Sequence, residues 1–317
     1  MKISKIDCWK TRIVASNRHP FDIMKVEGKS ILELRSFERI NKFTHLRKSV
    51  NIEADPFLFV KGDKLFLFYE SKIIGGKGII NMTWTYDLHT WSEPVTILTE
   101  SCHLSYPFVF KDDGKVYMIP ETGALKSIRL YQALDDSLTK WEYVCNLVEE
   151  NGNLKNVDLS FCDSSIIIRN GIYYLFTTIV RNHINELHLY YARDLKGPFE
   201  AHPLSPILRS NKYGRNAGSI ILYGNCLWRV TQECSNTYGE NVNIAKIIEI
   251  SPEKYAEVFY KDSFFDREES FYCDGAHQLN VVRFKNKFIV ATDAKGYRKV
   301  LFQRLVSKFV TPKINDR

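Results

Sequence analysis

The sequence predicts an all-β protein, and more narrowly a five-bladed β-propeller with four-stranded blades. A pattern of two apolar runs around a polar turn recurs five times, at spacings of 51, 57, 54 and 61 residues. Tyr and Phe, 17 and 20 of them, enrich the chain in residues that favour strands. A period of roughly 50 residues with about four strands per unit is typical of propeller blades.

Each copy of the pattern is predicted to form a β-hairpin. The copies cover 52–70, 103–121, 158–178, 215–233 and 275–293, with Pro56, Pro107, Ser164, Gly218 and Leu279 at equivalent positions. The predicted turns are Lys61-Gly62-Asp63, Asp112-Asp113-Gly114, Arg169-Asn170-Gly171, Tyr223-Gly224-Asn225 and Lys285-Asn286-Lys287. Four of the five turns carry Gly and the fifth carries Asn, as turn positions with φ > 0 require.

Further strands follow the hairpins and bring each unit to about four. "INMTWTYDLHTWSEPVTIL", "IRLYQALDDSLTKWEYVCNL" and "LHLYYARDLKGPFEAHPLS" each hold a strand, a turn and an aromatic residue. The last copy is followed by little more than "KVLFQRLVSKFV". We therefore expect N-terminal strands within 1–48, either "IDCWKTRIVAS" or "ILELRS", to complete a blade and close the ring. With no linker-like segment, 1–317 is predicted to be a single domain.

Composition narrows the possible classes of protein. The net charge of +7 fits a mildly basic surface, and it also allows a polyanion, an anionic membrane face or a nucleotide phosphate as a partner. Without a dense Lys/Arg run, nucleic-acid binding has little support. The seven Cys form no C-x-x-C pair, which indicates buried free thiols in a reducing compartment. No stretch is apolar enough for a signal peptide or a membrane span, so we expect a cytoplasmic protein.

Two rings of equivalent positions are expected to face one mouth of the propeller. In each hairpin the start of the first strand and the end of its antiparallel partner lie at the same edge. The strand-start ring is Asp55, Tyr106, Asp163, Ala217 and Gln278, and the strand-end ring is Glu70, Glu121, Thr178, Gln232 and Asp293, with Glu233 adjoining. So many convergent carboxylates must be paired or desolvated, which favours a functional mouth. The alternative is a solvated rim with salt bridges to Arg215 and His277.

Other positions at this mouth have a functional and a structural interpretation each. Tyr106 could stack on a sugar ring or donate a hydrogen bond to it, and His103 could contact the sugar or be a structural histidine. The planar fork of Arg215, next to Asn216, suits an anionic group such as a uronate, a sialate or a phosphate, or it balances charge. Tyr238 is placed for rim stacking or in a simple turn. No motif for a metal or an organic cofactor is present, so none is predicted.

The blade-start segments "ADPFLF", "CDSSIII" and "GAHQLNVV" resemble those of the five-bladed glycosidases of glycoside hydrolase family 43. The resemblance implies that Asp55 is the general base, that Asp163 tunes the acid, and that His277 lies near the axis. The family's general acid, a Glu that opens blade four, has no counterpart, because Arg215 and Asn216 stand in "GRNAGSI". Glu121 or Glu233 remain as candidate proton donors.

A closer resemblance covers roughly residues 50–260. "HLSYPFVF", "MIPET", "RNAGSII" and "TQECSNTYGENV" look like the propeller domain at the N-terminus of plant glucosamine inositolphosphorylceramide transferases. In those proteins sugar transfer is attributed to a separate domain. The resemblance implies a role in glycan biosynthesis.

Three functions follow from these patterns. The first is an enzyme of surface-glycan biosynthesis, a polysaccharide or glycolipid pathway, that acts on a glycosidic bond by transfer or hydrolysis. Its catalytic residues would be Asp55, Asp163, Glu121 and Glu233, and its substrate-binding residues would be Tyr106, His103, Arg215, Asn216, Gln232, Tyr238, His277 and Glu70. The second is a non-catalytic glycan-binding propeller beside a glycosyltransferase. The third is a scaffold for glycan-biosynthesis enzymes. The expected ligand is a sugar, glycan or sugar nucleotide.

Overall fold

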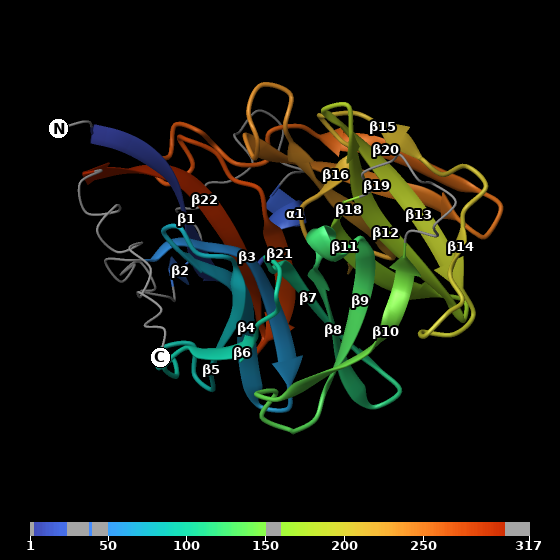
Figure 1. Ribbon diagram of the computed structural model, residues 1–317, viewed down its shortest axis with the longest axis horizontal. Helices are drawn as coiled ribbons and strands as arrows, with labels where there is room; N and C mark the ends of the chain where they lie inside the picture. The colour runs from blue at the N-terminus through green and yellow to red at the C-terminus, as the bar shows by residue number, and fades with distance from the viewer. Residues whose placement is uncertain (1–2, 24–37, 40–49, 150–159, 302–317) are drawn as a thin grey trace, which may run out of the picture.

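The protein is built almost entirely of β-strands. The computed structural model describes residues 3–23, 38–39, 50–149 and 160–301. Within them lie only one four-residue helix, α1 (Pro20–Ile23), and one 3-10 turn, η2 (Gly123–Leu125). The strands form four sheets that succeed one another around the molecule in chain order (Figure 1). The prediction of an all-β protein is therefore confirmed.

The first sheet joins the two ends of the described chain. Its order is β21-β22-β1-β3-β4-β5-β6, with β2 beside β1. The bounds are β1 (Ile3–Ser16), β2 (Glu38–Arg39), β3 (Val50–Lys61), β4 (Lys64–Ile73), β5 (Ile79–Thr85), β6 (Val95–Leu98), β21 (Leu279–Phe284) and β22 (Lys287–Leu301). β1 runs antiparallel to β22 along its whole length and meets β3 in one parallel pair, Trp9 with Ile52.

The position of β1 confirms that "IDCWKTRIVAS" pairs with the last strand of the chain. The other candidate segment, "ILELRS", lies outside the described residues, as does most of "KVLFQRLVSKFV". In Figure 1 the blue β1 lies between the red β22 and the strands of the first hairpin.

The other three sheets hold the second, third and fourth repeats. The second runs β10-β9-β8-β7: β7 (Ser105–Asp112), β8 (Lys115–Glu121), β9 (Ser127–Ala133) and β10 (Trp141–Glu149). The third has β11 (Phe161–Arg169), β12 (Ile172–Arg181), β13 (Ile184–Ala192), β14 (Glu200–Ala201) and β15 (Leu208–Arg209). The fourth has β16 (Arg215–Asn216), β17 (Ile221–Tyr223), β18 (Cys226–Glu233), β19 (Asn241–Ile250) and β20 (Tyr255–Lys261).

All five predicted hairpins and their turns are present. The pairs β3–β4, β7–β8, β11–β12, β17–β18 and β21–β22 close at the predicted positions. Positive φ occurs in each turn, at Gly62, Asp113-Gly114, Asn170-Gly171, Gly224-Asn225 and Lys285-Asn286. The fifth turn shows that a Lys-Asn pair, without glycine, adopts the same left-handed backbone.

Neighbouring sheets pack through apolar side chains. β3 contacts β7, β8 contacts β11, and β12 contacts β16, while within the first sheet β21 also contacts β3. Between the first two sheets, the buried Phe57 lies edge-on to Tyr106 and to Phe108, with ring centroids 4.8 and 5.8 Å apart. These contacts hold the starts of β3 and β7 side by side, which matters for the site described below.

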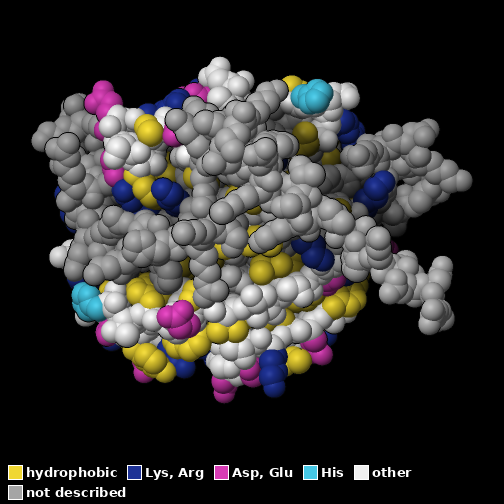
Figure 2. Space-filling view, turned by 60° about the vertical axis from the view of Figure 1, so that its left-hand side comes forward, with side chains coloured by type: hydrophobic (Ala, Val, Ile, Leu, Met, Phe, Trp, Pro, Cys, Tyr) yellow, Lys and Arg dark blue, Asp and Glu magenta, His cyan; other side chains and the backbone are white. Residues whose placement is uncertain are grey.

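The surface and the cysteines bear on the composition argument. On the face shown in Figure 2, basic and acidic side chains are interspersed over the lower half, so the net charge of +7 is not gathered there.

All seven cysteines are free thiols, as predicted. Cys145 and Cys226 are only half-buried and Cys273 is exposed, which corrects the expectation that these thiols are all buried. Among the described residues, helices long and apolar enough to cross a membrane are absent.

Candidate functional site

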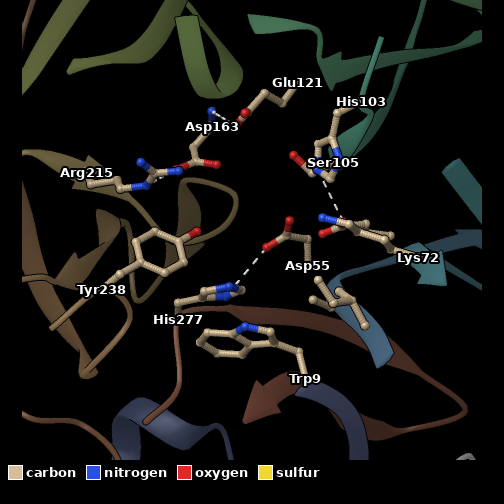
Figure 3. Close-up of a pocket in the computed structure, with 13 residues that line it drawn as sticks. Trp9, Asp55, Lys72, His103, Ser105, Glu121, Asp163, Arg215, Tyr238 and His277 are labelled. Atoms are coloured by element: carbon tan, nitrogen blue, oxygen red, sulfur yellow. Dashed lines mark hydrogen bonds and ion pairs between the residues drawn. The ribbon is translucent and has the colours of Figure 1, made fainter. Parts of the chain in front are cut away.

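One pocket gathers most of the predicted site residues. Its volume is about 210 Å³. It is lined by Trp9, Ile52, Ala54, Asp55, Glu70, Lys72, His103, Ser105, Glu121, Asp163, Arg215, Tyr238 and His277 (Figure 3). These residues come from all five repeats and from β1, so the pocket lies where the sheets converge. Pockets for drug-sized ligands measure ~300–1,000 Å³, so this one suits a single sugar ring.

A shared backbone feature aims two of the carboxylates inward. Asp55, Tyr106 and Asp163 have φ of 51°, 45° and 50°. Each lies in a β-bulge, where the pairing of the first and second strands of its hairpin shifts register. Bulges re-aim side chains, and a positive φ at a non-glycine residue persists only where its surroundings enforce it. The same strained backbone conformation, a positive φ within a β-bulge, therefore occurs at the same position in three repeats. This agreement confirms that the three positions are equivalent.

Strand-end side chains fasten each sheet to the next. Glu121 Oε2 accepts the Asp163 N–H at 3.3 Å, and Thr178 Oγ1 accepts the Asn216 N–H at 3.2 Å. In the same way Asp293 Oδ2 accepts the Asp55 N–H at 3.0 Å. These strand-end side chains therefore also have a structural role. Glu121 and Asp293 satisfy buried backbone donors that a bulge leaves without a strand partner.

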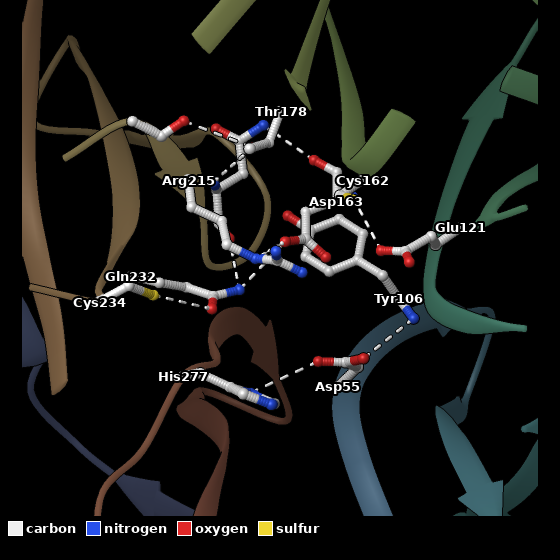
Figure 4. Close-up of polar contacts among 12 residues, drawn as sticks. Asp55, Tyr106, Glu121, Cys162, Asp163, Thr178, Arg215, Gln232, Cys234 and His277 are labelled. Carbon is white, nitrogen blue, oxygen red and sulfur yellow. Dashed lines mark hydrogen bonds and ion pairs between the residues drawn. The ribbon is translucent and has the colours of Figure 1, made fainter. Parts of the chain in front are cut away.

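Arg215 is held by a carboxylate of the protein itself. Its Nε lies 2.6 Å from Asp163 Oδ2, and its guanidinium lies 5.0 Å from the centre of the Tyr238 ring. Asp163 is buried and Arg215 is half-buried, with side-chain exposures of 3% and 13% (Figure 4). This geometry supports the charge-balance interpretation of Arg215 over the recognition of an anionic group.

His277 forms the second cationic centre. Its Nδ1 lies 2.8 Å from Asp293 Oδ2 and 3.5 Å from Asp55 Oδ1. Burial alone opposes charging, but the Asp293 carboxylate, with help from Asp55, raises the pKa of His277 to about 9. The indole of Trp9 stacks on the imidazole, with ring centroids 3.7 Å apart. At neutral pH this site therefore holds an imidazolium between two carboxyls and an aromatic face.

Two pocket carboxyls have raised pKa values. Burial raises the pKa of Asp55 to about 8, against the opposing effect of His277. Burial, and then the charge of Asp163, raise the pKa of Glu121 well above its usual range, although Arg215 acts in the opposite direction. A hydrogen bond to Asp163 adds to the same shift. Both groups can therefore carry a proton at neutral pH.

Glu70 and His103 face each other across the pocket wall. His103 Nδ1 accepts the Gly78 N–H at 2.9 Å, so the proton of the neutral ring is on Nε2. Nε2 lies 3.2 Å from Glu70 Oε1, but the contact lacks hydrogen-bond geometry, and Oε1 is buried without a hydrogen-bond partner. Glu70 therefore presents an unsatisfied carboxylate oxygen to the pocket.

Four of the predicted site residues do not line the pocket. Tyr106 is fully buried, and its hydroxyl bonds to the backbone of Gly218, so it offers no surface for a sugar. Asn216 Nδ2 donates to the Asp163 carbonyl at 2.8 Å, and Gln232 Nε2 donates to the Asp163 carboxylate at 3.1 Å. These two residues therefore support Asp163, and Figure 4 shows the contact from Gln232.

The fourth, Glu233, is excluded as a proton donor at this pocket. Its Oε1 accepts the Ser235 N–H at 2.9 Å, and its Oε2 accepts from Asn243 Nδ2 at 3.3 Å. The side chain is directed at these partners because neighbouring residues of a strand point to opposite faces. Of the predicted catalytic residues, Asp55, Asp163 and Glu121 are brought together, and Glu233 is not.

Five lining residues were missed: the apolar Ile52 and Ala54 beside Asp55, and Trp9, Lys72 and Ser105. Trp9 reaches the pocket because β1 pairs with β3 at this point, a contact over 43 positions that no local pattern reveals. Ser105 precedes the bulge of the second repeat, and Lys72 follows the strand end of the first. Ser105 is one position from Tyr106, and Lys72 is two positions from Glu70. This closeness to predicted site residues is the feature of the sequence that could have indicated them.

Asp55, His277 and Asp293 also approach within 4.8 Å of one another through possible metal-ligating atoms. Both oxygens of Asp293 already accept backbone N–H groups, one from Asp55 and the other from His277 and Gln278. We therefore describe this group as a hydrogen-bond hub, and the prediction of no metal stays a prediction.

Comparison with known proteins gives a family and a fold. Residues 40–294 match the family model described as glucosamine inositolphosphorylceramide transferase 1, N-terminal. The chain is 37% identical over 216 residues to glucosamine inositolphosphorylceramide transferase 1 of Oryza sativa subsp. japonica, covering 66% of this chain and 28% of the relative. It is 34% identical over 226 residues to that of Arabidopsis thaliana, covering 68% of this chain and 28% of the relative. The chain thus spans less than a third of the length of these relatives.

Solved structures are similar in fold alone. A family 117 glycoside hydrolase of the marine bacterium Zobellia galactanivorans superimposes with a TM-score of 0.53 at 14% identity, covering 77% of this chain and 84% of the hydrolase. A thermostable family-43 glycoside hydrolase superimposes with a TM-score of 0.50 at 14% identity, covering 67% of this chain and 75% of the hydrolase. The fold is therefore similar to that of propeller-type glycoside hydrolases, as the blade-start segments predicted.

Proposed function

The chain belongs to the N-terminal family of glucosamine inositolphosphorylceramide transferases, and we propose that it acts on a glycosidic bond in surface-glycan biosynthesis. Its pocket would hold one sugar residue of a glycan, a glycolipid or a sugar nucleotide. Glu121 would be the proton donor, Asp55 the base or orienting carboxylate, and Asp163 the residue that tunes the acid. The observation that carries this proposal is the Glu121–Asp163 pair, which faces the same pocket as Asp55.

The architecture that we propose for this function is a single, closed, five-bladed propeller. The five hairpins and the four sheets support five units. The pairing of β1 with β22, and the contact of β21 with β3, support closure between the last unit and the first. In such a ring, β1 would supply the third strand of the fifth blade, and Trp9 on it would reach the axis.

Glu121 has the properties of a general acid. A carboxyl can donate a proton at neutral pH only if its environment keeps it protonated. Burial and the neighbouring Asp163 do so here, and Glu121 remains partly exposed to the pocket. In the glycosidases that the sequence resembles, the acid opens blade four, where Arg215 stands. Glu121, on blade two, would supply the missing proton donor from the opposite side of Asp163.

The second candidate is a non-catalytic sugar-binding domain that works beside a glycosyltransferase. The pairing of Asp163 with Arg215, and of Asp55 with His277, favours it, because two carboxylates are already partly neutralised within the protein. The relatives contain more than twice as much chain outside the matched region as within it, which leaves room for a separate catalytic domain. A cytoplasmic location, next to enzymes that use sugar nucleotides, would suit either candidate.

Turnover separates the two candidates. Wild type, Glu121→Gln and Asp55→Asn would be incubated with aryl glycosides and sugar nucleotides, and ligand binding would be followed by saturation-transfer NMR. For an enzyme we expect turnover in wild type, a loss of at least about a hundredfold in each variant, and retained binding. Glu233→Gln is the matched control and should keep its activity. Binding without turnover in wild type would assign the sugar-binding role.

A further inference from the structure

A run of large apolar side chains lies exposed at the outer edge of the fourth sheet. β20 is the last strand of that sheet, and three consecutive residues on it, Val258, Phe259 and Tyr260, are 49%, 45% and 45% exposed. No other run of consecutive exposed large apolar residues occurs in the part of the chain that the structure describes. Single exposed apolar residues are ordinary, but a run of them at one edge indicates contact with another molecule.

The ring of Phe259 is one half of an aromatic pair with polar groups beside it. Tyr213, in the turn before β16, stacks on Phe259 with ring centroids 3.8 Å apart and planes 15° apart. The Tyr213 hydroxyl donates to Asp262 Oδ1 at 2.8 Å, and Lys212 Nζ donates to Asp262 Oδ2 at 2.7 Å. Lys212 Nζ also lies 5.1 Å from the centre of the Tyr213 ring. We call these four residues, Lys212, Tyr213, Phe259 and Asp262, the rim platform.

Two completely buried side chains hold the rim platform in place. Arg229 Nη2 donates to the Tyr213 carbonyl at 3.0 Å. Asn243 Nδ2 donates to the Lys212 carbonyl at 2.8 Å, and Asn243 Oδ1 accepts the Ser263 N–H at 2.8 Å. Asn243 thus ties together two of the segments that form the rim platform. An ion pair at the surface adds little stability by itself, so an exposed arrangement that is fixed from below indicates a preorganised binding surface.

The exposed groups of the rim platform match the chemistry of a sugar. The aromatic rings offer apolar surface, and a sugar ring has an apolar C–H face with hydroxyl groups around its edge. The side chains of Lys212 and Asp262 are 40% and 47% exposed, so both keep hydrogen-bonding capacity toward a ligand. An ammonium donates and a carboxylate accepts, whereas a hydroxyl group does both. Because the two charges cancel, the rim platform favours a neutral hydroxylated ligand over an ionic one.

The rim platform lies close to the central pocket. Tyr213 is two residues from Arg215, which lines that pocket, so their Cα atoms are at most about 7 Å apart. Tyr238, whose ring lies 5.0 Å from the Arg215 guanidinium, also lines the pocket and is 45% exposed. An oligosaccharide with its terminal residue in the pocket can therefore extend over the fourth sheet to the rim platform.

We propose that the rim platform is a second sugar-binding subsite, which holds a later residue of an oligosaccharide whose terminal residue occupies the central pocket. The inference rests on the proposed function and names its substrate class, a neutral oligosaccharide of several residues. A monosaccharide would fill the pocket and leave the rim platform empty. A protein partner would also cover exposed aromatic rings, but the balanced charged pair beside them and the short path to the pocket favour the glycan.

The first test measures how binding depends on the length of the glycan. Wild type would be screened on an array of neutral mono- to hexasaccharides that are immobilised through their reducing ends. The best series would then be titrated by isothermal titration calorimetry. We expect its longest member to bind at least about tenfold more tightly than the monosaccharide, because one additional sugar residue is stacked and hydrogen-bonded.

The second test assigns that gain to the rim platform. Phe259→Ala should bind the oligosaccharide no more tightly than wild type binds the monosaccharide. Phe259→Leu keeps an apolar side chain but has no flat ring, and it should behave in the same way. Tyr143→Ala is the matched control, because Tyr143 is likewise exposed, at 48%, on the outermost strand of the second sheet, and this variant should keep the full dependence on length. The melting temperature shows that each variant is folded.

The outcomes separate this inference from the proposed function. An affinity that does not depend on length, or that depends on it equally in Phe259→Ala, overturns the second subsite and keeps the sugar site of the pocket. If wild type self-associates on size-exclusion chromatography and Phe259→Ala is monomeric, the rim platform is a contact between copies of the chain and not a subsite. If wild type binds no glycan of any length, the proposed function fails together with the inference.

Discussion

The hydroxyl of Tyr106 makes the only pair of contacts, among the described residues, between the bulge of the second sheet and the backbone of Gly218. It donates to the Gly218 carbonyl at 2.7 Å and accepts the Gly218 N–H at 2.9 Å. Both residues are buried, so Tyr106→Phe would leave one donor and one acceptor without a partner. Each unsatisfied group costs ~1–3 kcal/mol. For the two groups together we therefore expect a loss of about 2–6 kcal/mol in the free energy of unfolding.

The melting temperature measures this loss. At roughly 2 °C per kcal/mol for a chain of this size, Tyr106→Phe should melt about 4–12 °C below wild type at the same scan rate. Tyr143→Phe is the matched control, because the Tyr143 hydroxyl bonds only at the surface, to Asn146, and its loss should cost under ~0.5 kcal/mol. The reasoning is refuted if Tyr106→Phe melts with wild type. If Tyr106→Phe instead lost sugar binding at unchanged stability, Tyr106 would have to be counted among the sugar-binding residues.

Three further predictions concern charge and backbone. Arg215→Met leaves Asp163 buried without its counter-charge and should cost about 3–5 kcal/mol, most of it recovered in the double variant with Asp163→Asn, as thermal unfolding would show. The pKa of His277 rises from 6.5 to about 9 on folding, so its stabilisation is complete below pH 6.5 and is lost as the pH rises through 9. The melting temperature should fall over this range, and a flat profile would contradict the assignment. Gly218→Ala, whose Cβ would lie 2.2 Å from a backbone carbonyl at φ 147°, should give little folded protein, whereas Gly62→Ala, with nothing within 4 Å, should fold.

Features encoded by neighbouring residues could be predicted from the sequence. The five hairpins follow from alternating apolar runs and from turn residues that tolerate positive φ, so even the Lys285-Asn286 turn was located. The equivalence of Asp55 and Asp163 follows from the same alignment, and both line the pocket.

Features that depend on contacts between sheets could not be predicted. Whether Glu121 or Glu233 faces the pocket depends on which side of its strand points to the axis, and on the Ser235 and Asn243 groups that bind Glu233. Tyr106 occupies the position of a site residue, yet its long side chain crosses to Gly218 instead of ending in the pocket. Strand spacing gives the ring of positions but not the length or the partner of each side chain.

Arg215, in the fourth repeat, bears on the electrostatics of the whole pocket. In the glycosidases that the sequence resembles, an acid stands where this chain has Arg215. Here Arg215 pairs with Asp163, and both the charge of Asp163 and its hydrogen bond to Glu121 raise the pKa of Glu121. Arg215 opposes that effect directly, but the pKa of Glu121 still lies well above its usual range, so burial and Asp163 dominate. Asp163 is thus contacted by Arg215 on one side and, together with burial, raises the pKa of Glu121 on the other.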